Sequence, residues 1–88
     1  MVRGDDRVTT EQKLRQIVGE IIGVDPQELN EHTTMQTVKD WDSLKQLSLM
    51  LALEQEFSIS IRPEDGLEMI SYPLIKLILR DNYSIPDL

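Results

Sequence analysis

Residues 40–57 read DWDSLKQLSLMLALEQEF, and this stretch decides the fold. From position 44 onward, more than half of its residues are apolar, and they recur at spacings of three and four. That spacing is the period of an α-helix. Asp42 is a favourable helix N-cap, and its charge suits the positive end of a helix dipole. The stretch therefore predicts a helix over about residues 43–57 whose apolar surface covers more than one face.

A second amphipathic helix is predicted upstream, over about residues 10–22. Thr9 and Gln12 fit a capping box at its start, and Gly23 is well placed to end it. Gly19 lies inside this helix, where glycine costs roughly 1 kcal/mol relative to alanine. The apolar stripe of this helix consists of Leu14, Ile17, Val18, Ile21 and Ile22.

A long polar connection, residues 24–42, separates these two helices. Its segment 25–28 combines a capping aspartate with a proline at the first helical position, so we expect one short turn of helix there. We expect Leu29 to point inward, and Met35 and Val38 to anchor the rest of the connection to the core. A loop of this length in a small domain is usually functional or disordered.

Two further helices are predicted in the C-terminal part of the chain. Residues 59–61 form an extended loop, Pro63 opens a short helix, and Pro73 starts the last helix, which Tyr83 closes. In the short third helix, the residues expected to face the core are Leu67, Met69 and Ile70.

The predicted fold class is therefore all-α. We expect a small bundle of three main helices plus one or two short ones, with a long loop between helices one and two. The 88 residues suit a single domain. The expected organisation is a flexible arm over residues 1–8, the helical domain over 9–83, and a frayed tail over 84–88.

Composition excludes several classes of function. The chain has no cysteine, which rules out a disulfide framework and thiol chemistry of its own. Its net charge of −7 disfavours binding to nucleic acid or to anionic membranes. The N-terminus lacks the apolar segment of a signal peptide, and the longest apolar run is too short to span a bilayer. We expect a cytoplasmic monomer.

The sequence contains few residues that could act in catalysis or bind a metal. His32 is the only histidine and lies in a polar loop, where a solvated side chain is the ordinary interpretation. Asp40 and Asp42 are close, but the glycine and distal glutamate of a calcium loop do not follow them. We therefore expect neither an enzyme nor a metal site, and a small hydrolase based on Ser43 would lack a base.

Ser43 itself allows two interpretations. Serine is common at helix N-termini because it caps well, so it could be purely structural. The free N–H groups and the dipole at the same position would also stabilise an attached phosphodiester. A serine that ends a long loop is moreover accessible to another enzyme.

The segment Asp40-Trp41-Asp42-Ser43-Leu44, with the helix that follows it, resembles the acyl carrier protein family. The family pattern is an Asp-Ser-Leu tripeptide that opens a helix ending in an acidic Ala-Leu-Glu-x-Glu-Phe stretch, here residues 52–57. Residues 21–26, IIGVDP, resemble the family's exit from the first helix. The resemblance covers roughly residues 10–80.

This resemblance implies a 4'-phosphopantetheine arm attached to Ser43, flanked by Asp42 and Leu44. A phosphopantetheinyl transferase would install the arm, and its thiol would carry an acyl or aminoacyl group as a thioester. Partner enzymes would dock on the second helix, where the matching positions are Leu44, Leu47, Leu51 and Glu54. The expected partners are an acyl- or aminoacyl-loading ligase or transferase, a synthase, and tailoring enzymes.

Two departures from the family pattern bear on the pathway. Lys45 stands where many carriers of fatty-acid synthesis have an acid, and Ser48 replaces a family glutamate. We therefore expect a specialised, polyketide-like pathway. A peptidyl or aminoacyl carrier, a fatty-acid carrier, and an unmodified helical interaction module are the alternatives.

Overall fold

Three long helices enclose the core in the computed structural model, which describes residues 9–88. They are α1 (Thr10–Ile22), α2 (Ser43–Phe57) and α4 (Tyr72–Tyr83), joined by a short α3 (Pro63–Glu68) and a 3₁₀ turn, η2 (Pro26–Glu28). Within residues 9–88 there is no strand, only an isolated antiparallel bridge between Thr34 and Ser71. The predicted all-α bundle is confirmed, while the predicted arm over residues 1–8 lies outside the described residues.

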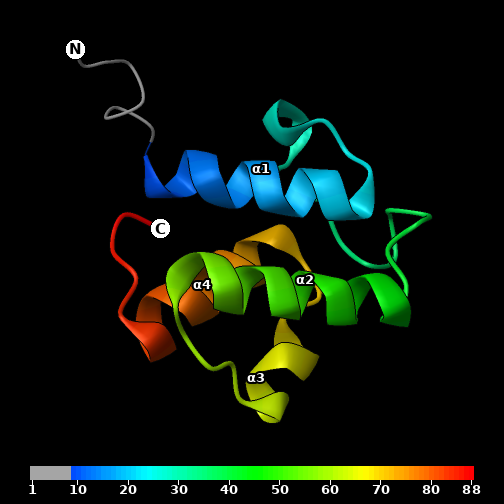
Figure 1. Cartoon of the computed structure of the whole chain (residues 1–88). Helices are drawn as coiled ribbons and strands as arrows, with labels where there is room; N and C mark the ends of the chain where they lie inside the picture. The colour runs from blue at the N-terminus through cyan, green and yellow to red at the C-terminus, as the bar shows by residue number, and fades with distance from the viewer. Residues whose placement is uncertain (1–8) are drawn as a thin grey trace.

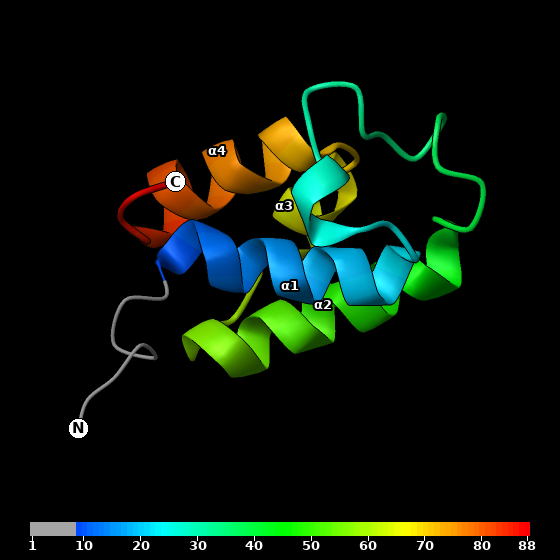
Figure 2. The same cartoon turned by 90° about the horizontal axis from the view of Figure 1, so that it is seen from above.

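The helices are arranged around α1 and α2, which run antiparallel and side by side (Figures 1 and 2). Helix α4 lies behind them, and α3 lies on the opposite side of the bundle from α1 (Figure 1). The connection between α1 and α2 folds back over α1, where η2 packs, before it reaches the start of α2. No helix of the described chain is long and apolar enough to cross a membrane.

The ends of α1 follow the predicted sequence signals, and the start of α4 differs from its prediction by one residue. Thr9 and Gln12 form the capping box of α1, and Gly23 ends this helix with a φ of 77°. Ser71 caps α4, which begins at Tyr72, one residue before the predicted start. The three long helices therefore each begin at a capping side chain and end at a residue in the left-handed conformation.

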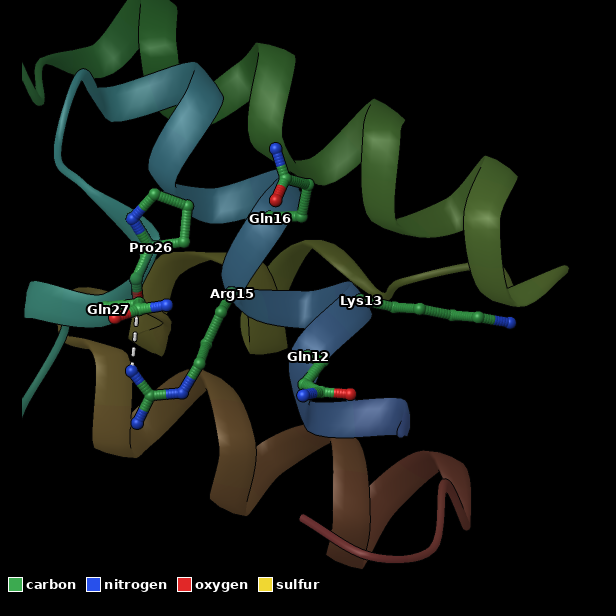
Figure 3. Close-up of a pocket in the computed structure, with 6 residues that line it drawn as sticks. All are labelled: Gln12, Lys13, Arg15, Gln16, Pro26 and Gln27. Atoms are coloured by element: carbon green, nitrogen blue, oxygen red, sulfur yellow. Dashed lines mark hydrogen bonds between the residues drawn. The ribbon is translucent and has the colours of Figure 1, made fainter. Parts of the chain in front are cut away.

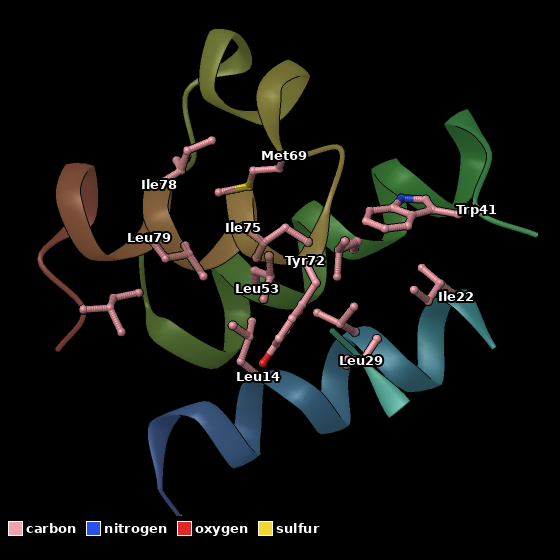
Figure 4. Close-up of a cluster of buried hydrophobic side chains, with 13 residues drawn as sticks. Leu14, Ile22, Leu29, Trp41, Leu53, Met69, Tyr72, Ile75, Ile78 and Leu79 are labelled. Atoms are coloured by element: carbon pink, nitrogen blue, oxygen red, sulfur yellow. The ribbon is translucent and has the colours of Figure 1, made fainter. Parts of the chain in front are cut away.

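The core is one apolar cluster between α1, α2 and α4 (Figure 4). Leu14, Leu53 and Ile75 are fully buried within it, one from each of these helices. Leu29 is buried as predicted, whereas Met35 and Val38 are only partly buried against the cluster. Trp41, which was not predicted to anchor the loop, is 2% exposed and packs at the Ile22 end of the cluster (Figure 4).

A partly buried polar contact joins α1 to α4 beside this core. The Glu11 carboxylate accepts hydrogen bonds from Lys76 Nζ at 3.0 Å and from the Tyr72 hydroxyl at 3.1 Å. Arg15 lies 3.3 Å from the same carboxylate. The bond from Lys76, followed by that from Tyr72, lowers the pKa of Glu11 against the opposing effect of burial.

The prediction that Leu67 and Ile70 face the core is wrong. Leu67 is 79% exposed and Ile70 46% exposed, while Met69 between them is fully buried. Helix α3 ends at Glu68, so the chain turns there and only Met69 reaches the core.

The tail also differs from the expected frayed segment, because Ile85 is buried and its N–H donates to the Leu79 carbonyl at 3.2 Å.

The long connection is held by its own polar side chains and by α4. The Thr34 and Thr37 hydroxyls accept hydrogen bonds from backbone N–H groups within the loop. The N–H of Tyr72 donates to the Thr33 carbonyl, and the N–H of Met35 donates to the Ile70 carbonyl. These bonds fix the segment that delivers the chain to the start of α2.

Candidate functional site

Ser43 is the first residue of α2 and is exposed. The N-cap is the preceding residue: Asp42 Oδ1 accepts from the Lys45 N–H at 2.9 Å. The Ser43 hydroxyl makes no hydrogen bond to the described residues. The capping function, which could have explained a serine here, is thus performed by its neighbour.

The amino end of α2 offers free backbone donors around this hydroxyl. The Asp42 carbonyl accepts the Gln46 N–H at 2.9 Å, and the Asp42 side chain accepts that of Lys45. The N–H groups of Ser43 and Leu44 are left without an acceptor in residues 9–88. Unpaired N–H groups at the positive end of a fifteen-residue helix favour a negatively charged group attached to Ser43.

A groove of about 560 Å³ begins at Ser43 and runs between α2 and α3. Its size falls in the range of small-molecule sites. Most of its walls are apolar, and the side chains that define them are Leu47, Met50, Leu51, Ile61, Leu67 and Ile70. The two residues wrongly expected in the core therefore form one wall of this groove.

The floor of the groove is formed where α2 and α3 approach each other. A Cβ on Gly66 would lie 3.2 Å from the Met50 sulfur, so the two helices are in close contact at this point. Gln46 also lies here, and its side chain bonds to backbone carbonyls at the end of α3. A residue larger than glycine at position 66 would push against the Met50 side chain.

Helix α3 is attached to α4 through Asp65, which is 6% exposed. Its carboxylate accepts from the Tyr83 hydroxyl at 2.6 Å, from Arg62 Nε at 3.1 Å and from Asn82 Nδ2 at 3.1 Å. The Tyr83 bond, and then that from Arg62, lowers the pKa of Asp65 although burial opposes the shift. The wall of the groove is thus held in place by a paired carboxylate.

The predicted docking residues on α2 are arranged as the helical period requires. Leu44, Leu47 and Leu51 are 70%, 57% and 58% exposed and share one side of the helix. Glu54, by contrast, is only partly exposed, and its Oε2 accepts from the Ile61 N–H at 2.7 Å. One carboxylate oxygen of Glu54 therefore orders the loop after α2.

A larger hollow, of about 700 Å³, lies over α1 and η2 and does not include Ser43 (Figure 3). All of its lining residues except Pro26 are polar or charged, and Arg15 donates to the Pro26 carbonyl at 2.9 Å and to the Leu29 carbonyl at 3.0 Å. The Arg15 guanidinium is therefore engaged in holding η2 against α1.

The charged residues that line the groove are Glu54 and Arg62. His32 is exposed, and no three His, Asp or Glu side chains are grouped as a metal site among residues 9–88. The sequence did not point to Gln46 or Gly66 as parts of the site. Neither residue type is diagnostic, and only the placement of α3 against α2 reveals their contacts.

Comparison with known proteins agrees with this geometry. Residues 12–70 match the family model described as phosphopantetheine attachment site. The acyl carrier protein of Zymomonas mobilis subsp. mobilis (strain ATCC 31821 / ZM4 / CP4) is 34% identical over 61 residues, which cover 69% of this chain and 77% of that protein. The exposed serine hydroxyl, the free N–H groups and the apolar groove fit the group that the family carries. The chain belongs to the acyl carrier protein family, whose prosthetic group is a covalently attached 4'-phosphopantetheine.

Proposed function

We propose that Ser43 is the residue to which the phosphopantetheine is attached, and that the protein delivers acyl groups to partner enzymes without catalysing a reaction itself. The observation that supports this most directly is the position of Ser43. It is an exposed hydroxyl beside unpaired helix N–H groups, at the mouth of an apolar groove. The attached group would supply a thiol that bears the acyl chain as a thioester.

The residues around Ser43 have distinct tasks in this proposal. Asp42 fixes the start of α2, so that Ser43 is presented to a transferase with its hydroxyl uncommitted. The end of the helix stabilises the phosphodiester electrostatically. The groove receives an apolar chain and shields it from water. Leu44, Leu47 and Leu51, with Glu54 at the edge, form the docking surface for partners.

The experiment is loading of the apo protein by a promiscuous phosphopantetheinyl transferase with coenzyme A and magnesium. We expect a mass gain of one phosphopantetheine in the wild type and none in Ser43→Ala. Ser43→Ala should change stability by no more than a few tenths of a kcal/mol, because Asp42 is the cap. Ser48→Ala, also exposed on α2, is the matched control and should load normally.

A mass gain that persists in Ser43→Ala would contradict the assignment of Ser43. Failure of the wild type to load would favour the alternative, an unmodified interaction module on the same fold. In that case the apo protein should bind its partners fully.

For the pathway, we propose a specialised, polyketide-like system served by a monomeric cytoplasmic carrier. The surface of α2 supports this, since Lys45 is exposed near Ser43 and Glu54 is partly engaged by the loop. The docking surface is therefore less acidic than that of a general fatty-acid carrier. Loading of the holo protein by isolated acyl and aminoacyl ligases, compared with a fatty-acid malonyl transferase, would decide between the carrier classes.

A further inference from the structure

We propose that Gln46 is a positioning residue that fixes α3 against α2 and thereby sets the shape of the groove beside Ser43. The proposal rests on the proposed function in one respect: it takes the groove to be where the acyl chain lies. The rest of the argument concerns contacts within the described chain.

The carboxamide of Gln46 bonds to three partners. Its Oε1 accepts from Trp41 Nε1 at 2.7 Å, and its Nε2 donates to the carbonyls of Gly66 and Met69, each at 2.9 Å. The indole nitrogen can only donate and the carbonyls can only accept, so the partners determine the orientation of the amide. We call this set of bonds the Gln46 bridge.

Each end of the Gln46 bridge is attached to a buried group. Trp41 is 2% exposed and lies two residues before Ser43, while Met69 is fully buried in the core. The Gly66 carbonyl lies in the last turn of α3, where it also accepts the Met69 N–H at 3.3 Å, and the Met69 carbonyl lies just past the end of the helix. The bridge therefore links the segment that positions Ser43 to the end of the opposite wall.

Helix α3 needs such contacts because it has only six residues. A helix of that length is not stable alone, so its position depends on tertiary contacts. Asp65 holds it to α4 through Tyr83, and Gln46 holds it to α2. Since Gln46, Met50, Gly66 and Leu67 all line the groove, a shift of α3 would change the groove directly.

The first test uses the apo protein and compares Gln46→Met with Gln55→Met. Methionine keeps the length of the side chain and removes all three bonds, whereas Gln55 is exposed on the same helix and serves as the matched control. We expect about tenfold faster hydrogen exchange of the Trp41 indole and of the amides of α3 in Gln46→Met, or about 1.4 kcal/mol of local opening. Equal exchange in the two variants would overturn the proposal.

Trp41→Phe keeps the test decisive if Gln46→Met does not fold. This variant retains an aromatic ring and removes the donor to Oε1 together with part of the buried indole, while Gln46 keeps its bonds to α3. We expect a smaller acceleration of exchange at α3, about two- to fivefold. No acceleration in Trp41→Phe, with Gln46→Met unfolded, would count against the bridge.

The second test loads the wild type and both Gln variants with acetyl- or octanoyl-phosphopantetheine and measures cleavage of the thioester by hydroxylamine. Acetyl is too short to fill the groove, so the ratio of acetyl to octanoyl rates measures shielding of the longer chain. We expect Gln46→Met to lower this ratio by about three- to tenfold relative to Gln55→Met, with acetyl rates unchanged. An unchanged ratio would refute the inference, whereas failure of the wild type to load would refute the proposed function and leave the apo test standing.

Discussion

At the scale of single residues, the beginning of α2 depends on Asp42, while Ser43 is free for another use. Replacing Asp42 by alanine removes the acceptor of the Lys45 N–H. We expect Asp42→Ala to lower the free energy of unfolding by about 1 kcal/mol, the usual cost of losing an N-cap. Urea denaturation measures this difference.

The control for this prediction is Asp40→Ala, which removes the same charge from a neighbouring exposed position. The Asp40 side chain accepts no hydrogen bond within the described residues. A loss of stability in Asp40→Ala equal to that in Asp42→Ala would mean that charge, and not capping, is responsible. Comparison of the pair thus separates the two explanations for an aspartate before the serine.

Sequence reasoning was successful for residues whose effect is local. The cap at Asp42, the capping box at Thr9 and the end of α1 at Gly23 depend on neighbours within a few positions. The contacts of Trp41 and Gln46 could not be predicted, because their partners are distant in sequence or are residues that no sequence motif marks. A glutamine in an apolar helix shows its purpose only when α3, twenty residues later, is placed beside it.

At the scale of the helices, α1 is shaped by a glycine that helix propensity disfavours. A Cβ on Gly19 would lie 2.5 Å from the Val24 carbonyl oxygen and 3.1 Å from Pro26 Cγ. Alanine would gain roughly 1 kcal/mol in helix propensity, but a backbone oxygen at this distance cannot move without displacing the loop. We expect Gly19→Ala to destabilise the protein by about 1–3 kcal/mol, measured by thermal or urea unfolding.

Lys13→Ala is the control for this prediction, because Lys13 is exposed on the same helix. It tests helix propensity without the contact to the loop, and should change stability by less than about 0.5 kcal/mol. If Gly19→Ala stabilised the protein, the close approach of the loop to α1 would be wrong.

Helix α3 shows why the presence of a helix can be predicted from the sequence while the side chains that it buries cannot. Pro63 and the acids after it correctly marked a short helix. The prediction of which of its residues are buried is wrong, because a six-residue helix contains too little periodicity to define an apolar face. Leu67 and Ile70 line the groove, and their hydrophobicity alone does not distinguish the wall of a groove from a core.

At the scale of the whole molecule, the response to acid reports how α3 is held. The pKa of Asp65 is lowered in the folded state, first of all by the Tyr83 hydroxyl. Below about pH 4 the unfolded chain therefore binds more protons at this residue than the folded protein does. The stabilisation from Asp65 is complete above that pH and is lost as the pH falls through its lowered pKa.

We expect Tyr83→Phe to lower stability most at neutral pH, with a difference from the wild type that shrinks below about pH 4. The net charge of −7 also diminishes in acid, but both proteins share this effect, so it cancels in the difference. Tyr72→Phe is the matched control, because it removes a hydroxyl from Glu11 while Lys76, the main cause of the lowered pKa there, remains. Its difference from the wild type should depend less on pH. Urea unfolding at a series of pH values measures both, and a difference for Tyr83→Phe that is constant with pH would show that Asp65 does not anchor α3 as an ionised group.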